Sequence, residues 1–225
     1  MDDVLRRSAA HVLVDDVAAP APDDATAHHL GRVLRLRDGE VVTVTDGAGH
    51  WRACRVSGAG LEIDGAVEDV ARPGLGVTIA VAPPKGERLE WLVQKCTEVG
   101  VDRIVLLSAE RSVVRWDGER AARQLARLRR IAVEASLQAR RVWLPELAGP
   151  MAAVDVLATT VVAEPGGRAL GAEDATVAIG PEGGWSPAEV AAAAGQVSLG
   201  PNVLRVETAA VVAASTMVAF RSVLR

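Results

Sequence analysis

The feature that most constrains the fold is the alternation of strand-like and helix-like segments from residue 76 onward. Short runs rich in Val, Ile, Leu and Ala are separated by longer segments in which apolar residues recur at helical spacing. Strands that alternate with helices predict a parallel sheet with helices on its faces, which binds its ligand beyond the carboxyl ends of the strands. The expected strands are 77–82, 103–107, 159–163, 176–179 and 197–199, and the expected helices are 85–100, 119–141, 186 to about 195, and 207–223.

Local signals indicate where two of these helices begin or end. Residues 85–100 have one apolar helical face, and Gly100 follows it as a stop signal. At the helix beginning near 186, Ser186 is the expected N-cap, Pro187 suits the first helical position, and Glu189 completes a capping box. The residues expected to face inward from the 119–141 helix are Leu125, Leu128, Ala132 and Ala135.

Residues 1–70 follow a different pattern, with short β-like runs separated by turns. The runs are 11–14, 40–45, 51–56 and 61–67, and a short helix at 26–36 interrupts them. Strands at this spacing with glycine turns predict a small all-β barrel. Arg72-Pro73-Gly74 then marks a boundary. The sequence therefore predicts two domains, 1–72 and 73–225.

Charge is unevenly distributed along a chain whose net charge is −4. Residues 1–70 carry a net charge of −6, whereas residues 85–141 hold 13 Lys or Arg and 8 Asp or Glu, a net charge of +5. A basic segment in an acidic chain indicates either a polyanion-binding site or one solvated helix face.

Several protein classes are disfavoured by what the sequence lacks. Two cysteines, Cys54 and Cys96, are too few for a disulfide scaffold or a Cys-rich zinc module, and the four histidines show no metal-ligand spacing. The first residues lack a signal-peptide core, and no stretch is apolar enough for a membrane span. We therefore expect a cytoplasmic protein without a metal ion and without a membrane partner.

Two glycine-rich segments stand at predicted strand ends, and each leads into a predicted helix. The first is 179–185 (IGPEGGW), and the second is 199–210 (LGPNVLRVETAA). Glycines here let backbone approach a ligand, and the following helix offers free N–H groups; the alternative is an ordinary turn. The sequence contains no G-x-G-x-x-G opening a βαβ unit, no P-loop and no G-x-S-x-G elbow. A Rossmann dehydrogenase, a P-loop ATPase and a serine hydrolase are therefore disfavoured.

The two segments, in this order and at this separation, resemble the ribosomal RNA small subunit methyltransferase E family of the SPOUT superfamily. Further matches are H-x-x-x-V-L-R at 29–35, K-G at 85–86, Q-K-x-x-E-x-G at 94–100 and a near match to S-E-R-S at 109–112. The resemblance implies an S-adenosylmethionine-dependent enzyme that methylates N3 of a uridine in 16S ribosomal RNA, within the small ribosomal subunit. It also implies a homodimer, in which a PUA-like, RNA-binding β-barrel precedes an α/β domain with a C-terminal trefoil knot.

Candidate site residues lie in the matched motifs. Removing the N3 proton of uridine leaves negative charge on O2, N3 and O4, which an Arg stabilises, while a carboxylate or a water takes the proton. Arg205 and Glu207 suit these catalytic roles, and the alternative for Glu207 is a first-turn acid favoured by the helix dipole. The residues expected to bind the cofactor are Val162, Ala163, Ile179, Gly180, Glu182, Gly183, Gly184, Leu199, Gly200, Leu204, Arg205, Thr208 and Ala209.

The expected RNA-binding surface consists of basic side chains, which contact phosphates without reading sequence. Trp116 is the indole expected to touch RNA. The basic candidates are Arg32, Arg35, Lys85, Arg111, Arg115, Arg123, Arg127, Arg130 and Arg141. The chain departs from the family pattern at Ala109 and Leu137, where the family has Ser and an acid. Two alternatives stay open: a related methyltransferase acting on another RNA position or a 2′-hydroxyl, and an RNA-binding module without catalysis.

Overall fold

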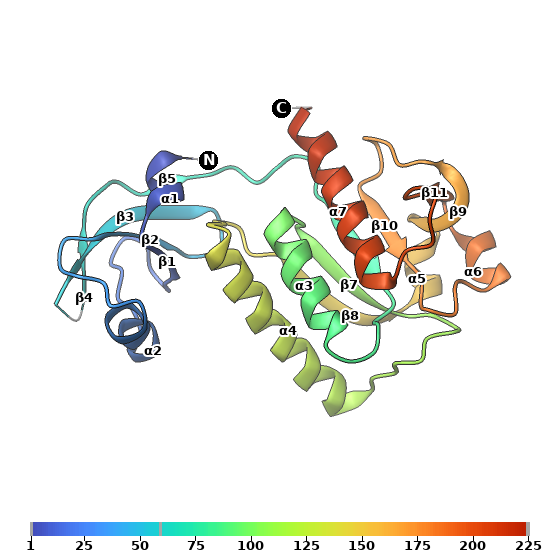
Figure 1. Ribbon diagram of the computed structural model, residues 1–225, viewed down its shortest axis with the longest axis horizontal. Helices are drawn as coiled ribbons and strands as arrows, with labels where there is room; N and C mark the ends of the chain where they lie inside the picture. Colours follow the sequence, from blue (N-terminus) through green and yellow to red (C-terminus); the bar gives the residue numbers. More distant parts are fainter. Residues whose placement is uncertain (1, 59, 224–225) are drawn as a thin grey trace. The chain divides into compact units, whose positions relative to one another are not determined.

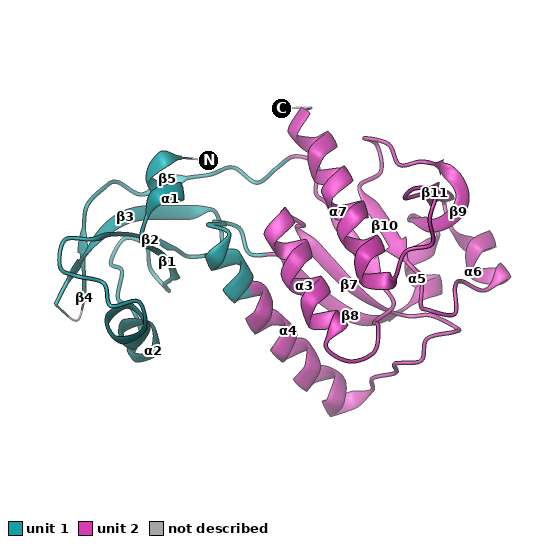
Figure 2. Ribbon diagram, viewed as in Figure 1, with its two compact units in different colours: residues 1–73, 133–144 teal, residues 74–132, 145–225 magenta. Residues whose placement is uncertain are grey.

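The computed structural model describes residues 2–58 and 60–223, which form two compact units (Figure 1). Residues 1–73 and 133–144 make up the first unit, and residues 74–132 and 145–225 make up the second (Figure 2). The break after residue 73 falls within the Arg72-Pro73-Gly74 segment. Residues 133–144, in contrast, were predicted within the second domain and are found in the first unit.

The first unit contains a five-stranded sheet. Its strands are β1 (Ala10–Leu13), β2 (Val41–Thr45), β3 (His50–Ser57), β4 (Gly60–Ile63) and β5 (Glu68–Asp69). The order is β1-β2-β3-β4, with β5 also beside β3; β1 and β2 are parallel, and the other pairs are antiparallel. The predicted β-like runs are confirmed as strands, although the last run ends at Ile63 and β5 follows it. Closure of this sheet into a barrel stays a prediction.

Three short helices accompany this sheet: α1 (Asp3–Arg7), α2 (Asp24–His28) and the π-helix η1 (His29–Val33). The helix predicted over 26–36 therefore begins earlier and ends earlier. Arg35 has a φ of 55°, a left-handed conformation that does not continue a right-handed helix. The buried core of the unit consists of apolar side chains from the strands and η1, among them Val12, Leu30, Val42, Val44 and Cys54.

His11 on β1 is bonded to the segment that follows α4 (Gly118–Gln138). Its Nε2 lies 3.1 Å from the backbone oxygen of Arg141, and its Nδ1 lies 2.8 Å from Thr43 Oγ1. Because a carbonyl oxygen only accepts, Nε2 carries the proton and Nδ1 accepts from the Thr43 hydroxyl. The Arg140 guanidinium donates to the backbone oxygen of Ser8 at 2.8 Å. These bonds explain why residues 139–142 belong to the first unit.

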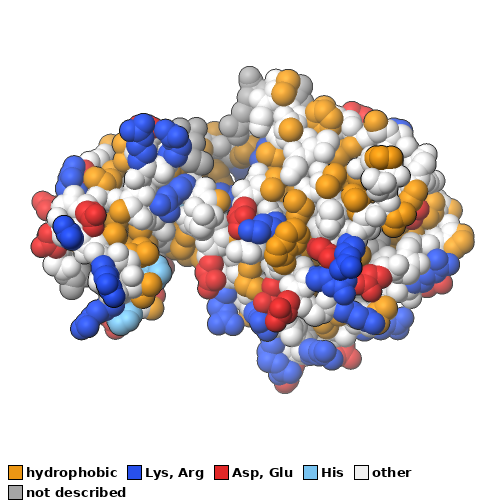
Figure 3. All heavy atoms as spheres, in the orientation of Figure 1, with side chains coloured by type: hydrophobic (Ala, Val, Ile, Leu, Met, Phe, Trp, Pro, Cys, Tyr) orange, Lys and Arg blue, Asp and Glu red, His pale blue; other side chains and the backbone are white. Residues whose placement is uncertain are grey.

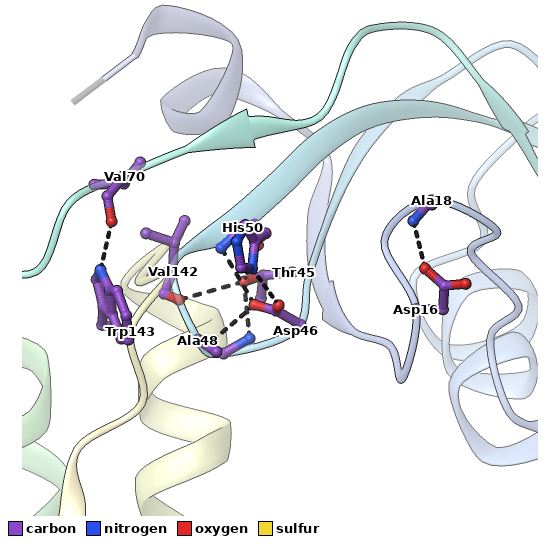
Figure 4. Close-up of polar contacts among 10 residues, drawn as sticks. Asp16, Ala18, Thr45, Asp46, Ala48, His50, Val70, Val142 and Trp143 are labelled. Atoms are coloured by element: carbon purple, nitrogen blue, oxygen red, sulfur yellow. Dashed lines mark hydrogen bonds and ion pairs between the residues drawn. The ribbon is translucent and has the colours of Figure 1, made fainter.

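Trp143 packs within the same unit (Figure 4). Its indole N–H donates to the backbone oxygen of Val70 at 2.8 Å, and the Arg72 guanidinium lies 4.9 Å from the ring centroid. Gly49 has a φ of 103°, and a Cβ there would lie 2.5 Å from the Trp143 ring, so this turn requires glycine. Trp143 is therefore a packing residue.

The second unit is a six-stranded sheet in which all neighbouring strands are parallel. Its strands are β6 (Thr78–Val81), β7 (Arg103–Ser108), β8 (Glu146–Ala152), β9 (Val161–Ala169), β10 (Thr176–Ile179) and β11 (Gly195–Ser198). The order is β11-β9-β10-β6-β7-β8. The predicted parallel sheet is confirmed. β8 was not predicted, because Gly149-Pro150 within it indicates a turn when only sequence is considered.

Helices cover both faces of this sheet, as predicted. α3 (Arg88–Val99), α4 and α7 (Val206–Val223) pack on one face, where the core includes Leu92, Leu128 and Ala210 (Figure 1). α5 (Ala153–Leu157) and α6 (Pro187–Ala192) pack on the other, where Leu157 and Trp185 are buried. Successive residues of each strand alternate between these two cores. The sheet is thus buried on both faces, which explains the nearly continuous apolar character of its strands.

Two predicted helix ends are confirmed. Gly100 has a φ of 116° and its N–H bonds to the Cys96 oxygen at 3.2 Å, which ends α3. Ser186 and Glu189 form the predicted capping box of α6. α7 is long and apolar enough to cross a membrane by length and composition alone. Its Ala210, Ala213, Ala214 and Met217 are buried in the core of the second unit, where α7 packs against α3, β6 and β10.

Candidate active site

A cavity of about 530 Å³ lies beside the middle of β9 and the carboxyl ends of β10 and β11. This is the edge of the sheet at which a parallel α/β fold binds its ligand. The loops after β10 and β11 supply most of the wall, β9 and the start of α7 supply further parts, and α3 contributes one side chain. The lining residues are Arg88, Ala163, Glu164, Pro165, Ile179, Gly180, Pro181, Glu182, Gly184, Trp185, Ser198, Leu199, Gly200, Asn202, Val203, Leu204, Arg205, Val206 and Ala209.

The loop after β10 requires two of its glycines. A Cβ on Gly180 would lie 3.0 Å from both Cε2 and Nε1 of Trp185, so this glycine lets the indole pack against the backbone. Gly184 has a φ of 69°, and its N–H bonds to the Pro181 oxygen at 2.8 Å, which closes the turn. Trp185 is 4% exposed, and its Nε1 has no hydrogen-bond partner among the described residues.

The segment after β7 fixes this loop from outside the cavity. The Arg111 guanidinium donates to the backbone oxygens of Gly183 at 3.3 Å and Trp185 at 3.2 Å. The buried Glu189 carboxylate accepts the Glu110 N–H through Oε1 at 2.8 Å and the Ser186 N–H through Oε2 at 2.9 Å. Arg111, which was predicted to bind RNA, is exposed and holds this loop through its guanidinium; its RNA contact stays a prediction.

The loop after β11 is held by short-range bonds. Ser198 Oγ donates to the Gly200 oxygen at 3.2 Å, and the Gly200 N–H lies 3.4 Å from the same hydroxyl. Gly200 has a φ of 135°, which side-chain-bearing residues rarely adopt, and open space surrounds the position where a Cβ would stand. The loop ends at Arg205, whose backbone oxygen accepts the Ala209 N–H at 2.8 Å in the first turn of α7.

Among the described residues, four charged side chains line the cavity: Arg88, Glu164, Glu182 and Arg205. Arg88 Nη1 donates to Glu182 Oε1 at 2.7 Å, and both side chains are about half exposed. Arg205 is exposed, and no ion pair is found for it within residues 2–58 and 60–223. In the same part of the chain, no group of three His, Cys, Asp or Glu side chains is placed to hold a metal ion.

Most residues predicted to bind the cofactor line this cavity. Three do not: Val162 is buried in the sheet, Gly183 lies against Arg111, and Thr208 is exposed on α7. The predicted residues that the structure brings together there are Ala163, Ile179, Gly180, Glu182, Gly184, Leu199, Gly200, Leu204, Arg205 and Ala209. Arg88 was missed, although it follows the Lys85-Gly86 pair beyond the carboxyl end of β6. Trp185 and Asn202 carried no separate signal in the sequence.

The two predicted catalytic residues lie in different environments. Arg205 lines the cavity, whereas Glu207 does not. Glu207 is 9% exposed in the first turn of α7, and its Oε2 has no hydrogen-bond partner among the described residues. Successive helical residues are rotated by about 100°. Val206 and Ala209 face the cavity, so the register of α7 turns Glu207 away from it.

Some of the residues predicted to bind RNA are exposed, and others form ion pairs with Glu side chains. Arg123 pairs with Glu119 at 3.2 Å, and Arg127 pairs with Glu90 at 2.9 Å. Arg32, Arg35, Lys85, Arg115 and Arg130 are exposed, while Arg141 is partly buried. On the face of the second unit drawn in Figure 3, Lys and Arg side chains gather near the start of α4, with Asp and Glu side chains among them.

The exposed tryptophan is not the one expected from the sequence. Trp116, the tryptophan expected to touch RNA, is partly buried and packs against the main core. Trp91 on α3 is 45% exposed instead.

Comparisons with known proteins identify both parts of the chain. The RNA methyltransferase domain matches residues 72–218, and the RNA methyltransferase PUA domain matches residues 22–62. Ribosomal RNA small subunit methyltransferase E of Mycobacterium bovis is 35% identical over 231 residues, which cover 89% of this chain and 86% of the relative. The protein of the same name from Bacillus subtilis is 28% identical, over 84% of this chain and 86% of the relative.

A solved structure agrees with these matches over nearly the whole chain. The ribosomal RNA small subunit methyltransferase E of Neisseria gonorrhoeae, bound to S-adenosyl methionine, superposes with a TM-score of 0.79 at 27% identity. The alignment covers 92% of this chain and 96% of that one. The chain therefore belongs to the ribosomal RNA small subunit methyltransferase E family.

Proposed function

We propose that this protein transfers a methyl group from S-adenosylmethionine to N3 of a specific uridine in 16S ribosomal RNA. The observation that carries the proposal is the cavity at the ends of β10 and β11, whose wall includes Arg205, a side chain with no ion pair to another described residue. The family and the S-adenosyl methionine held by a relative of the same fold support it. The trefoil knot, the homodimer and the small subunit as partner stay predictions drawn from the resemblance.

The cavity fits a nucleoside with an amino-acid tail. Its volume of about 530 Å³ lies within the range of about 300–1,000 Å³ that is common for small-molecule sites. Leu199, Leu204 and Ile179 offer apolar surface for a base, and glycine backbone at 180 and 200 permits close approach. Trp185 Nε1, buried in this wall without a partner among the described residues, is a donor that still needs an acceptor.

We assign Arg205 to a contact with the uracil ring that accepts the methyl group. The donor supplies an electrophilic methyl group, so the protein must align the uridine nitrogen with it and stabilise the charge left when N3 loses its proton. That charge spreads over O2, N3 and O4. An exposed guanidinium in the cavity wall, with no ion pair to another described residue, is available to donate to these oxygens.

The proton acceptor is assigned to Glu164 rather than Glu207. Glu207 does not line the cavity, whereas Glu164 and Glu182 do. Glu182 is already bonded to Arg88. Glu164 is therefore the carboxylate left to receive the N3 proton, directly or through a water.

Exposed basic side chains of the second unit are available to bind phosphates of the RNA substrate. Lys85 lies three residues before the cavity residue Arg88, and Arg115 and Arg130 are exposed. Arg123 and Arg127 must release Glu119 and Glu90 to bind phosphate. Such contacts give affinity without sequence information. Arg32 and Arg35 offer further basic groups in the PUA-matching segment.

Mapping methylated nucleotides in ribosomal RNA from a deletion strain tests the proposal. We expect N3-methyluridine to disappear from one 16S position and to return with the wild-type gene. Arg205→Gln and Glu164→Gln should fail to restore it, whereas Arg103→Gln, which breaks a surface pair with Glu146, should restore it. An unchanged N3-methyluridine content, or the loss of a 2′-O-methyl group instead, would contradict the proposed reaction.

A further inference from the structure

Arg88 and Glu182 form an ion pair within the wall of the cavity. Arg88 is the first residue of α3, and Glu182 lies in the loop after β10. Arg88 Nη1 and Glu182 Oε1 are 2.7 Å apart, with 41% and 40% of the two side chains exposed. We propose that this pair binds the α-amino-acid end of the methyl donor, with Arg88 binding the α-carboxylate and Glu182 the α-ammonium group. The inference rests on the proposed function, since it assigns one end of that ligand.

The charges around the cavity favour this pair over the other two charged groups. An amino-acid end is a zwitterion, so its receptor needs a cation and an anion side by side. Arg88 and Glu182 meet this requirement, whereas no bond joins Arg205 to Glu164 among the described contacts. Each partner exchanges its bond to the other for a bond to the ligand. Because half-exposed ion pairs contribute little to stability, separating this one costs little.

The local structure around Arg88 also favours the binding of an anion. Arg88 begins a helix of 12 residues, and the N-cap residue Glu87 makes no side-chain bond to the first turn. The first N–H groups of α3 are therefore open to a ligand or to water, and the helix dipole adds positive potential there. A guanidinium beside such a helix start binds a carboxylate through charge-assisted hydrogen bonds.

A second interpretation is that the pair only fastens the loop after β10 to α3. The two interpretations predict that different ligands bind more weakly when Arg88 is replaced. A loosened loop would weaken the binding of every ligand of the cavity, because Gly180 and Gly184 of the same loop line it. A lost carboxylate contact, in contrast, would weaken only those ligands that carry the amino-acid end.

Calorimetry with two ligands on the full-length protein separates these cases. S-adenosylhomocysteine carries the amino-acid end, and 5′-methylthioadenosine has the same nucleoside and thioether without it. We expect Arg88→Gln to weaken S-adenosylhomocysteine binding about tenfold or more, which is the scale of a charge-assisted hydrogen bond. The same change should leave methylthioadenosine binding within about twofold. Glu182→Gln provides a second variant, with the same selective loss through the ammonium group.

Arg103→Gln is the matched control. Arg103 forms a similarly exposed pair with Glu146 at 3.3 Å, and neither residue lines the cavity, so both affinities should stay unchanged. Equal losses for the two ligands in Arg88→Gln, or no loss for either, would overturn the inference. A selective loss in Arg205→Gln instead would also overturn it. A wild-type protein that binds neither ligand would overturn the proposed function itself, which is a distinguishable result.

Discussion

Protonation of His11 is expected to destabilise the first unit as the pH falls. His11 is 4% exposed, and burial lowers its pKa from 6.5 to about 4. Because the folded-state pKa lies below the unfolded one, the folded chain binds fewer protons between these two values. The stability associated with the neutral ring is therefore complete above pH 6.5 and is lost as the pH falls toward 4. The difference corresponds to about 3 kcal/mol, at about 1.4 kcal/mol per pH unit.

His11→Gln isolates this effect. A glutamine amide can donate to the Arg141 oxygen and accept from the Thr43 hydroxyl, but it does not titrate. Urea unfolding followed by tryptophan fluorescence, repeated between about pH 7 and pH 4, gives the free energy of unfolding for both proteins. We expect the wild-type value to fall by about 3 kcal/mol more than the variant's over this range. Parallel curves for the two proteins would refute the reasoning.

His50 provides a control with the opposite sign. Its Nδ1 lies 2.6 Å from Asp46 Oδ2, and this hydrogen bond raises the pKa of His50 (Figure 4). A raised folded-state pKa gives stability that is present below the unfolded value and is lost as the pH rises through the folded value. His50→Gln should therefore differ from the wild type most at acid pH, where His11→Gln reduces the loss instead.

The remaining predictions concern the cavity, the RNA surface and assembly. Gly200→Val and Gly180→Val should both abolish S-adenosylmethionine binding in calorimetry. Both should also lower the melting temperature, since Val does not fit the φ of 135° at position 200, and at position 180 its side chain would strike Trp185. Undiminished affinity in both variants would refute this placement. Replacing Arg123, Arg127 and Arg130 by Ala should lower the slope of log K for RNA binding against log salt concentration by about two to three, at about one per phosphate contact, with cofactor affinity unchanged. An unaltered slope would mean that these three side chains face solvent and do not contact phosphate. Sedimentation at micromolar concentration should show a homodimer, and a monomer with full cofactor affinity would show that the interface is not part of the site.

The elements that position the cavity were predictable because their signals are local. A capping box depends on residues three positions apart, so Ser186 and Glu189 place the start of α6 from sequence alone. The stop at Gly100 is equally local, since only the left-handed conformation of one residue is required. The two glycine-rich strand ends likewise predicted most of the cavity wall.

Side-chain direction at the start of α7 was not predictable in the same way. Arg205 and Glu207 stand two residues apart and suit one reaction equally well by chemistry. Their separation in space is determined by the residue at which the loop ends and the helix begins, Val206. One residue of shift would rotate Glu207 by about 100° and could change which acids line the cavity. No pattern in the flanking residues fixes that register.

The role of Arg111 depends on strand order, which the sequence does not contain. β10 and β7 are both neighbours of β6, although they lie far apart along the chain. Because parallel strands end at the same edge, the segment after β7 comes to lie beside the loop after β10. The Arg111 guanidinium can then bond to the Gly183 and Trp185 oxygens, and Glu189 can accept the Glu110 N–H. Strand order thus brings a basic residue that suggests a phosphate contact in a linear segment against the loop that forms part of the cavity wall.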